Sequence, residues 1–162
     1  MKFSYLILLI FFLYIDLPAQ NKISFNISTI NNKKIELNKL YSKGPVLVNF
    51  WALWCEPCKE EMRHLNQIYE KYKAKGFTIL GINQDSPKSV SKVRAYIASH
   101  RIDFPIALDP DFQYLQKMNG QSIPYSVLFD TGGNVVYKNV GYLPGDETKL
   151  ENEIRKLIPG DK

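Results

Sequence analysis

Two cysteines stand two residues apart in the segment NFWALWCEPCKEEM, residues 49–62, and the chain of 162 residues has no others. A disulfide between Cys55 and Cys58 would close a ring of only four residues, so it would remove little conformational entropy from the unfolded chain. The spacing therefore indicates a chemical function for the pair rather than a structural one.

The pair is predicted to lie at the start of a helix that covers about residues 56–75. The apolar residues of this helix recur at helical steps: Met62, Leu65, Tyr69 and Tyr72. Cys58 precedes this stripe by one turn and should be buried with it. Cys55 falls at the N-cap, outside the first turn, where it can be exposed. We therefore expect one reachable sulfur and one covered sulfur.

The start of a helix favours the thiolate form of a cysteine, because its unpaired N–H groups and its dipole stabilise negative charge. In CxxC sites of this kind the thiol pKa can fall from about 8.5 to about 3.5–7.5. Pro57 fits the first turn, where its missing N–H has no cost, and it stiffens the link between the thiols. Glu56 is a negative charge nearby and opposes the thiolate.

These positions predict thiol–disulfide exchange in two steps. The Cys55 thiolate attacks a substrate disulfide, and Cys58 then attacks Cys55 and releases the reduced substrate. Cys58 must lose its proton in the second step. Glu61, three residues later, flanks the apolar stripe and is expected to be half-buried, with a raised pKa that suits a proton acceptor. The alternative is an exposed glutamate that complements the helix dipole, as we expect for Glu60.

The elements that would position the pair alternate between strands and helices. A β-hairpin is predicted over residues 23–37, followed by a loop at 42–45 and a buried parallel strand at 45–50 that leads into the cysteines. The further expected elements are strands at 77–83, 103–109 and 125–130, helices at 86–100, 111–118 and 145–158, and a tight turn at 131–134 into a last strand.

This order predicts an α/β fold with a mixed sheet flanked by helices on both faces. The strands around the turn at 131–134 must pair antiparallel, because so short a connection permits nothing else. No linker rich in proline or glycine interrupts residues 20–162, so we expect a single domain there.

Residues 1–19 have the pattern of a signal peptide. Lys2 precedes an apolar run over residues 3–15 that only Ser4 interrupts, and Ala19 offers a cleavage point. The run is shorter than the roughly 20 residues of a membrane-spanning helix. We therefore expect an exported, periplasmic protein, with a short uncleaved membrane anchor as the alternative.

The net charge of +5 is spread over lysines that are interspersed with glutamates. Because there is no stripe of basic residues with interleaved aromatic residues, nucleic-acid binding is not expected.

The segment VLVNFWALWCEPCKEEM, residues 46–62, resembles the active-site segment of thioredoxin-like proteins. Within that superfamily it is most similar to the exported TlpA/ResA-type thiol-disulfide oxidoreductases, because Trp-Cys-Glu-Pro-Cys is followed by Glu61 three residues on. The resemblance covers most of residues 24–158. It implies a thioredoxin-like fold with an N-terminal β-hairpin and a central insert, between Asn83 and Pro124, that adds a helix and a strand.

The resemblance also implies binding residues. Pro124, in SIPYSVLFD, stands in the place of a cis-proline opposite the cysteines, and Ile123 would offer its backbone to an extended substrate. Trp54, next to Cys55, would cover the disulfide. Asn49 stands where cytosolic thioredoxins carry a buried aspartate, so the role of that carboxylate would pass to Glu61. Tyr125 replaces a common threonine and either alters substrate choice or fills a groove.

Members of this branch commonly reduce disulfides of other exported proteins, including apocytochromes c, with electrons from a membrane thiol-transfer protein. The resemblance implies the same for this chain, without a cofactor. A thiol peroxidase-like antioxidant protein and a thiol oxidase of the same fold are the alternatives, as is a binding module with an inert disulfide. A zinc site would need a second ligand pair beside Cys55 and Cys58, which His64 and His100 do not supply at suitable spacing. Attachment of a haem would need a histidine in place of Lys59.

Overall fold

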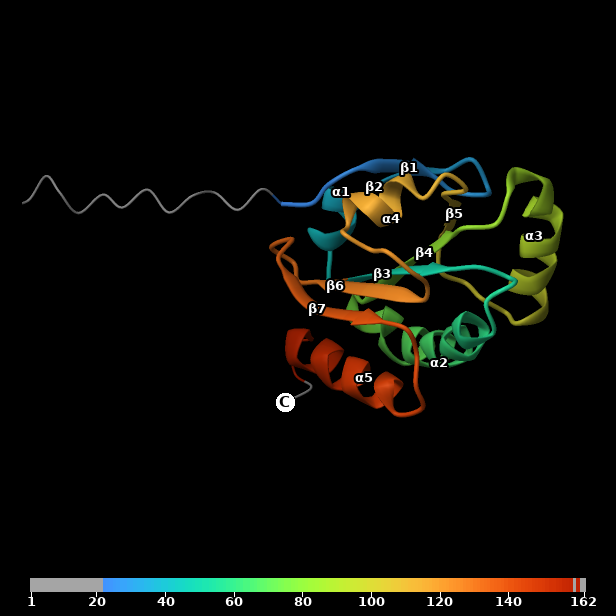
Figure 1. Cartoon of the computed structure of the whole chain (residues 1–162). Helices are drawn as coiled ribbons and strands as arrows, with labels where there is room; N and C mark the ends of the chain where they lie inside the picture. The colour runs from blue at the N-terminus through green and yellow to red at the C-terminus, as the bar shows by residue number, and fades with distance from the viewer. Residues whose placement is uncertain (1–21, 159, 161–162) are drawn as a thin grey trace, which may run out of the picture.

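The computed structural model describes residues 22–158 and 160, which form a central sheet with further elements on both of its faces (Figure 1). The predicted signal peptide at residues 1–19 lies outside this range, and so it stays a prediction. Within the described part of the chain, no helix combines the length and the apolar character that crossing a membrane requires.

The central sheet has five strands in the order β5-β4-β3-β6-β7. Their bounds are β3 Val46–Trp51, β4 Thr78–Asn83, β5 Ile106–Leu108, β6 Tyr125–Phe129 and β7 Val135–Val140. β3 pairs parallel with β4, and β4 with β5, whereas β6 pairs antiparallel with both β3 and β7. The predicted mixed sheet is therefore confirmed.

The middle strand β3 leads directly into the cysteine segment, and all six of its residues are buried. Side chains of a strand alternate between its two faces. Leu47 and Trp51 accordingly belong to the apolar core on one face, and Val48 and Phe50 to the core on the other. A strand covered on both sides reads as a continuous apolar run, which is why it could be recognised from the sequence.

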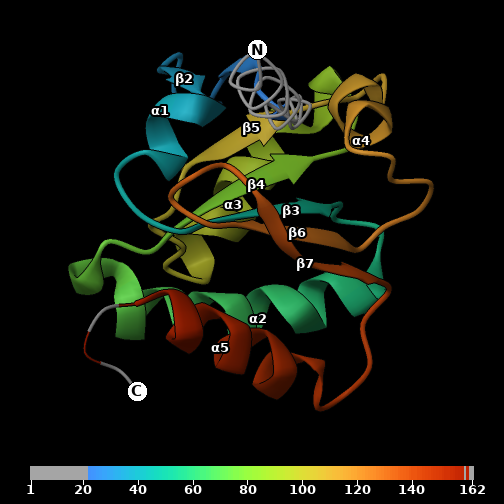
Figure 2. The same ribbon diagram turned by 90° about the vertical axis from the view of Figure 1, so that its left-hand side faces the viewer.

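Different elements cover the two faces of the sheet (Figure 2). On one face lie α2, Glu56–Tyr72, and α5, Asp146–Leu157. On the other lie the hairpin of β1 and β2 and the short helices α1 and α4. These elements span Asn26–Ser28, Lys34–Glu36, Leu37–Tyr41 and Gln113–Lys117. The predicted N-terminal hairpin is thus present, with β1 and β2 paired antiparallel.

The segment between β4 and β6 contains the additional helix and strand that the resemblance implied. A 3-10 turn, η2, at Pro87–Ser89 precedes α3, Val90–Ser99, and β5 extends the sheet beyond β4. Asp109 ends this strand region and accepts hydrogen bonds from the backbone N–H groups of Gln113, Tyr114 and Leu115. Its carboxylate therefore satisfies the free donors at the start of α4.

Three local predictions need correction. The sequence did not indicate α1, because a five-residue helix is too short for a helical period to emerge; only Leu37 and Tyr41, four positions apart, face the core. The helix expected over 56–75 ends its α-helical part at Tyr72 and continues as a 3-10 turn, η1, Lys73–Lys75, up to Gly76 with a φ of 90°. The helix expected over 86–100 begins as the 3-10 turn η2.

Candidate active site

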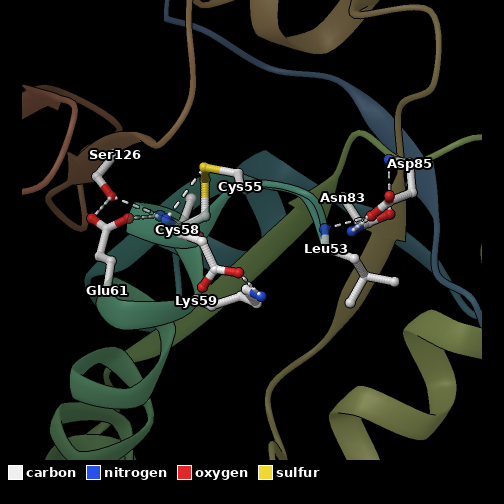
Figure 3. Close-up of a disulfide and its surroundings, with 10 residues drawn as sticks. Leu53, Cys55, Cys58, Lys59, Glu61, Asn83, Asp85 and Ser126 are labelled. Carbon is white, nitrogen blue, oxygen red and sulfur yellow. Dashed lines mark hydrogen bonds and ion pairs between the residues drawn. A yellow bond between two sulfur atoms is a disulfide. The ribbon is translucent and has the colours of Figure 1, made fainter.

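Cys55 and Cys58 form a disulfide at the junction of β3 and α2 (Figure 3). Cys55 is the N-cap of α2 in an extended conformation, and its Sγ accepts a hydrogen bond from the backbone N–H of Cys58 at 3.3 Å. Pro57 occupies the first turn of the helix, as the sequence predicts. The sulfur of Cys55 therefore lies where the free N–H groups of the helix can stabilise a thiolate after reduction.

The exposure of the two cysteines differs less than expected. Cys58 is 0% exposed and Cys55 is 7% exposed, so the order is as predicted, but Cys55 is also buried. The disulfide joins the Cys55 sulfur to Cys58, which lies in the core. Both cysteines belong to the same apolar cluster as Met62 and Leu65.

The charges beside Cys55 are partly compensated. Glu56, whose side chain is 81% exposed, forms an ion pair with Lys59 on the next turn. An exposed pair of this kind is screened by water and contributes little to stability. It places a lysine near the cysteines and weakens the opposition of Glu56 to a Cys55 thiolate.

Glu61 lies deeper than the sequence suggests. Its place on the helix predicts a half-buried side chain, but it is only 5% exposed. Its Oε2 accepts a hydrogen bond from Asn49 Nδ2 at 2.8 Å, and its Oε1 accepts one from Ser126 Oγ at 3.0 Å. Asn49 Nδ2 also donates to Ser126 Oγ at 3.0 Å. Three neighbouring elements, α2, β3 and β6, thus hold one carboxylate beside the disulfide (Figure 3).

The surroundings of Glu61 make it a group that can gain and lose a proton near neutral pH. Burial raises its pKa from 4.5 to about 7, although the hydrogen bonds from Ser126 and Asn49 act in the opposite direction. Negative charge on Asp146 adds slightly to the increase. A carboxyl group with a pKa near the working pH is suited to general acid–base chemistry.

Asn49 and Ser126 allow Glu61 to be either charged or neutral. The Oδ1 atom of Asn49 is buried and has no hydrogen-bond partner among the described residues. An ionised Glu61 needs donors, which Asn49 Nδ2 and Ser126 Oγ provide. A protonated Glu61 needs an acceptor, and the Ser126 hydroxyl oxygen or a turned Asn49 amide can provide one. The sequence drew attention to Asn49 but not to Ser126.

A second buried carboxylate fixes the loop before Cys55. Asp85 follows β4, is 6% exposed, and accepts hydrogen bonds at Oδ2 from the backbone N–H of Leu53 and from Asn83 Nδ2, both at 2.8 Å. The backbone N–H of Asp85 in turn donates to Asn83 Oδ1 at 3.0 Å. No local pattern in the sequence indicates this role, because Leu53 lies 32 positions away from Asp85.

The residues expected to bind substrate differ in exposure. The Trp54 side chain is 64% exposed next to Cys55. The Ile123–Pro124 peptide bond is cis, and Ile123 packs against the apolar cluster that contains both cysteines. Tyr125 is buried, stacks on Phe50 and donates its hydroxyl to the carbonyl of Met118 at 2.9 Å. Tyr125 therefore fills the core.

Metal ligands do not gather in the part of the chain that the structure describes, where no group of three or more His, Cys, Asp or Glu side chains could hold an ion. His64 lies 3.6 Å from Glu60, and the His100 ring stacks on Tyr96. Neither histidine joins the cysteines in a ligand set.

Comparison with known proteins adds to this geometry. Residues 18–138 match the model of the AhpC/TSA family. The chain is 35% identical over 138 residues to the thiol-disulfide oxidoreductase ResA of a Bacillus cereus strain, a match that covers 84% of this chain and 76% of the relative. It is 32% identical over 138 residues to the ResA of Bacillus subtilis, with coverage of 85% and 74%.

A solved structure with a similar fold also carries the name of a thiol–disulfide protein. A protein from Chlorobium tepidum that carries the provisional name of thiol:disulfide interchange protein DsbE superposes with a TM-score of 0.75. It is 29% identical, and the match covers 84% of this chain and 94% of that protein. The fold of this chain thus also occurs in a solved protein whose name gives it thiol–disulfide chemistry.

Proposed function

Since this chain belongs to the AhpC/TSA family of thioredoxin-like proteins, we propose that it works outside the cytoplasm as a reductant of disulfides in other exported proteins. The chain is a thiol-disulfide oxidoreductase, as its ResA relatives and its paired cysteines indicate. The observation that supports our assignment of the site most directly is the Cys55–Cys58 disulfide at the start of α2 with Glu61 buried beside it.

The reaction starts from the reduced protein. The Cys55 thiolate attacks one sulfur of the substrate disulfide, and the other substrate sulfur leaves as a thiolate that takes a proton from solvent. Glu61 then accepts the proton of Cys58, and the Cys58 thiolate attacks Cys55. The bond between Cys55 and the substrate breaks, the substrate leaves fully reduced, and two electrons have passed from the protein to the substrate.

Binding of the substrate would use the surface around Trp54 and the backbone of Ile123 and Pro124. An extended peptide next to a strand end can pair with free backbone groups, which gives affinity without strict sequence requirements. Apocytochrome c is one example of an exported dithiol protein that would fit. A membrane thiol-transfer protein would return the oxidised form to the dithiol state.

Charges at the site support the proposed preference for reduction. Reduction of the disulfide creates a thiol at Cys58 beside the buried carboxyl group of Glu61, and negative charge there disfavours a thiolate. Glu56 acts in the same sense near Cys55, although its ion pair with Lys59 weakens the effect and the start of α2 acts against it. Both effects make a thiolate in the reduced protein less stable relative to the disulfide. The reduced protein is therefore a better electron donor.

Two measurements on the protein test this function. The first is insulin reduction in the presence of dithiothreitol: the wild type is expected to accelerate precipitation, and Cys55→Ser to abolish the acceleration. Cys58→Ser is the matched variant, and it should accumulate a mixed disulfide with a substrate peptide, detectable by mass. Wild-type protein that fails to accelerate precipitation would exclude the proposed activity.

The second measurement is the reduction potential. A value near or below about −220 mV fits a reductant, whereas a value near about −120 mV identifies the thiol oxidase alternative. A peroxidatic mechanism needs one activated cysteine rather than a pair. With dithiothreitol as the reductant of the oxidised cysteine, it therefore predicts that Cys58→Ser keeps peroxide turnover, while the dithiol mechanism predicts that the variant loses disulfide reduction.

A further inference from the structure

A proton that enters Glu61 from Cys58 must return to solvent before the next cycle. Glu61 is 5% exposed, and both of its oxygens are held by hydrogen bonds to Asn49 and Ser126 on the sheet. Proton transfer to bulk water from so enclosed a group needs a carrier close to it. The route of this proton rests on the function proposed above, because the proton is released in that reaction.

A small cavity lies against Glu61, and neither cysteine is among the residues that line it. Its volume of about 10 Å³ is close to the ~10–15 Å³ that one water molecule needs. The empty space around it, including its opening to solvent, is about 250 Å³. Glu61 and Ser126 line its inner end, and Leu65 and Leu150 form apolar walls.

The outer end of the cavity carries a cluster of polar groups. The Tyr142 hydroxyl donates to Glu147 Oε2 at 2.8 Å, and the His64 ring stacks on the Tyr142 ring with centroids 5.9 Å apart. The backbone N–H of Gly145 also donates to Glu147 Oε2, at 2.9 Å. Glu147 is therefore held in place at the start of α5, with one oxygen engaged by two donors.

Asn139 is a further polar residue that lines the cavity. Asn139 Nδ2 donates to the carbonyl of Gly141 at 2.9 Å and lies 3.5 Å from Asp146 Oδ2. The titratable groups that line the cavity besides Glu61 come from three places: His64 on α2, Tyr137 on β7, and Tyr142, Asp146 and Glu147 in the loop before α5 and its first turn. A water molecule in the cavity would lie among these residues, and their polar groups are its candidate partners.

We propose that this cavity is the passage through which Glu61 exchanges its proton with solvent, with one water molecule as carrier and Glu147 as the positioning residue at its outer end. In the forward direction Glu61 takes the proton from Cys58, passes it to the water in the cavity, and the water delivers it beside Glu147. The carboxylate of Glu61 is regenerated. The electrons stay with the sulfur atoms, so the passage moves only a proton.

The experiment separates this proton step from the attack on the substrate. Reduced protein is mixed rapidly with an excess of a disulfide-containing peptide, and the fluorescence of Trp51 and Trp54 follows the reaction. The first attack depends on peptide concentration, whereas the plateau rate at high concentration reports the attack of Cys58. Near pH 7 part of the molecules start with Glu61 protonated, and these must release that proton through the passage before Glu61 can accept the one from Cys58. We compare wild type with Glu147→Gln, which keeps an oxygen that can accept the hydrogen bond from Tyr142 and loses the charge.

Glu147→Gln is expected to lower the plateau rate at least about threefold between pH 6 and 8, and to leave the first attack unchanged. Added imidazole, a small proton carrier, should restore part of the rate. Glu151→Gln is the matched control, because Glu151 lies one turn further along α5 and contacts Lys71 and Tyr72 instead of the cavity. It should leave both rates unchanged.

A second measurement needs no variant. A high-resolution crystal structure of the full-length protein should contain an ordered water in the cavity within hydrogen-bonding distance of Glu61. If the cavity is dry, or if Glu147→Gln and wild type have the same plateau rate from pH 5 to 9, the passage is wrong while the proposed function stands. If wild-type protein fails to reduce insulin, both proposals are wrong.

Discussion

Glu61 makes the stability of the protein depend on pH. Because its pKa rises from 4.5 to about 7 on folding, the folded protein holds a proton between these values that the unfolded chain has lost. The contribution of this group to stability is therefore present below about pH 4.5 and is lost as the pH rises through 7.

Glu61→Gln should remove this dependence. The free energy of unfolding of the variant, relative to wild type, is expected to increase by up to ~3 kcal/mol between pH 4.5 and pH 8. Urea titrations of both proteins at a series of pH values give this difference directly. A difference between the two proteins that is constant over this range would mean that Glu61 does not titrate as its burial implies.

At the residue scale the sequence predicted where the candidate catalytic residues lie, but not the contacts that hold them. The spacing of the cysteines and the helical position of Glu61 follow from a local pattern, so they could be predicted. Ser126 and Asp85 act through contacts with residues 65 and 32 positions away. Only the pairing of β3 with β6, and the return of the chain after β4, bring these groups together, and one sequence contains no sign of either contact.

The loop between β3 and α2 depends on a single carboxylate. Asp85→Ala would leave the backbone N–H of Leu53 and the amide of Asn83 without their acceptor, at a cost of about 1–3 kcal/mol per unpaired buried group. We expect lower stability in urea and faster local motion of Trp54, measured by fluorescence anisotropy.

Asp85→Asn keeps an oxygen at the same place and should retain more of the stability than Asp85→Ala. Asp111→Ala, at an exposed aspartate, serves as the control and should resemble wild type. If Asp85→Ala unfolds at the same urea concentration as wild type, the loop is held by other contacts, and Asp85 has no positioning role.

At the element scale the long periodic segments were predictable and the short ones were not. α2 has a clear apolar stripe over seventeen residues, and β3 and β4 are mostly apolar runs, so their positions could be predicted to within a few residues. α1 has five residues, and its place is decided by packing of Leu37 and Tyr41 beneath the sheet. Such an element depends on tertiary contacts that a local pattern cannot contain.

At the scale of the whole molecule, redox state and folding are linked by a thermodynamic cycle. The reduction potential of the folded protein differs from that of the unfolded chain by the difference in stability between its oxidised and reduced forms, with about 1.4 kcal/mol for each 30 mV. A reductant must therefore be more stable when oxidised. The burial of Cys58 and of the neighbouring Glu61 supports greater stability of the oxidised form. After reduction, the same buried space must hold Cys58 as a separate thiol or as a charged thiolate.

We therefore expect the oxidised protein to unfold at a higher denaturant concentration than the reduced protein. The measurement is a pair of guanidinium titrations, one without reductant and one with an excess of a phosphine reductant, at the same pH. A variant with both Cys55→Ser and Cys58→Ser is the control, and its midpoint should be the same in both titrations. Greater stability of the reduced form would reverse the inferred direction and make the protein an oxidant, because a fold that favours the dithiol withdraws electrons from its partners.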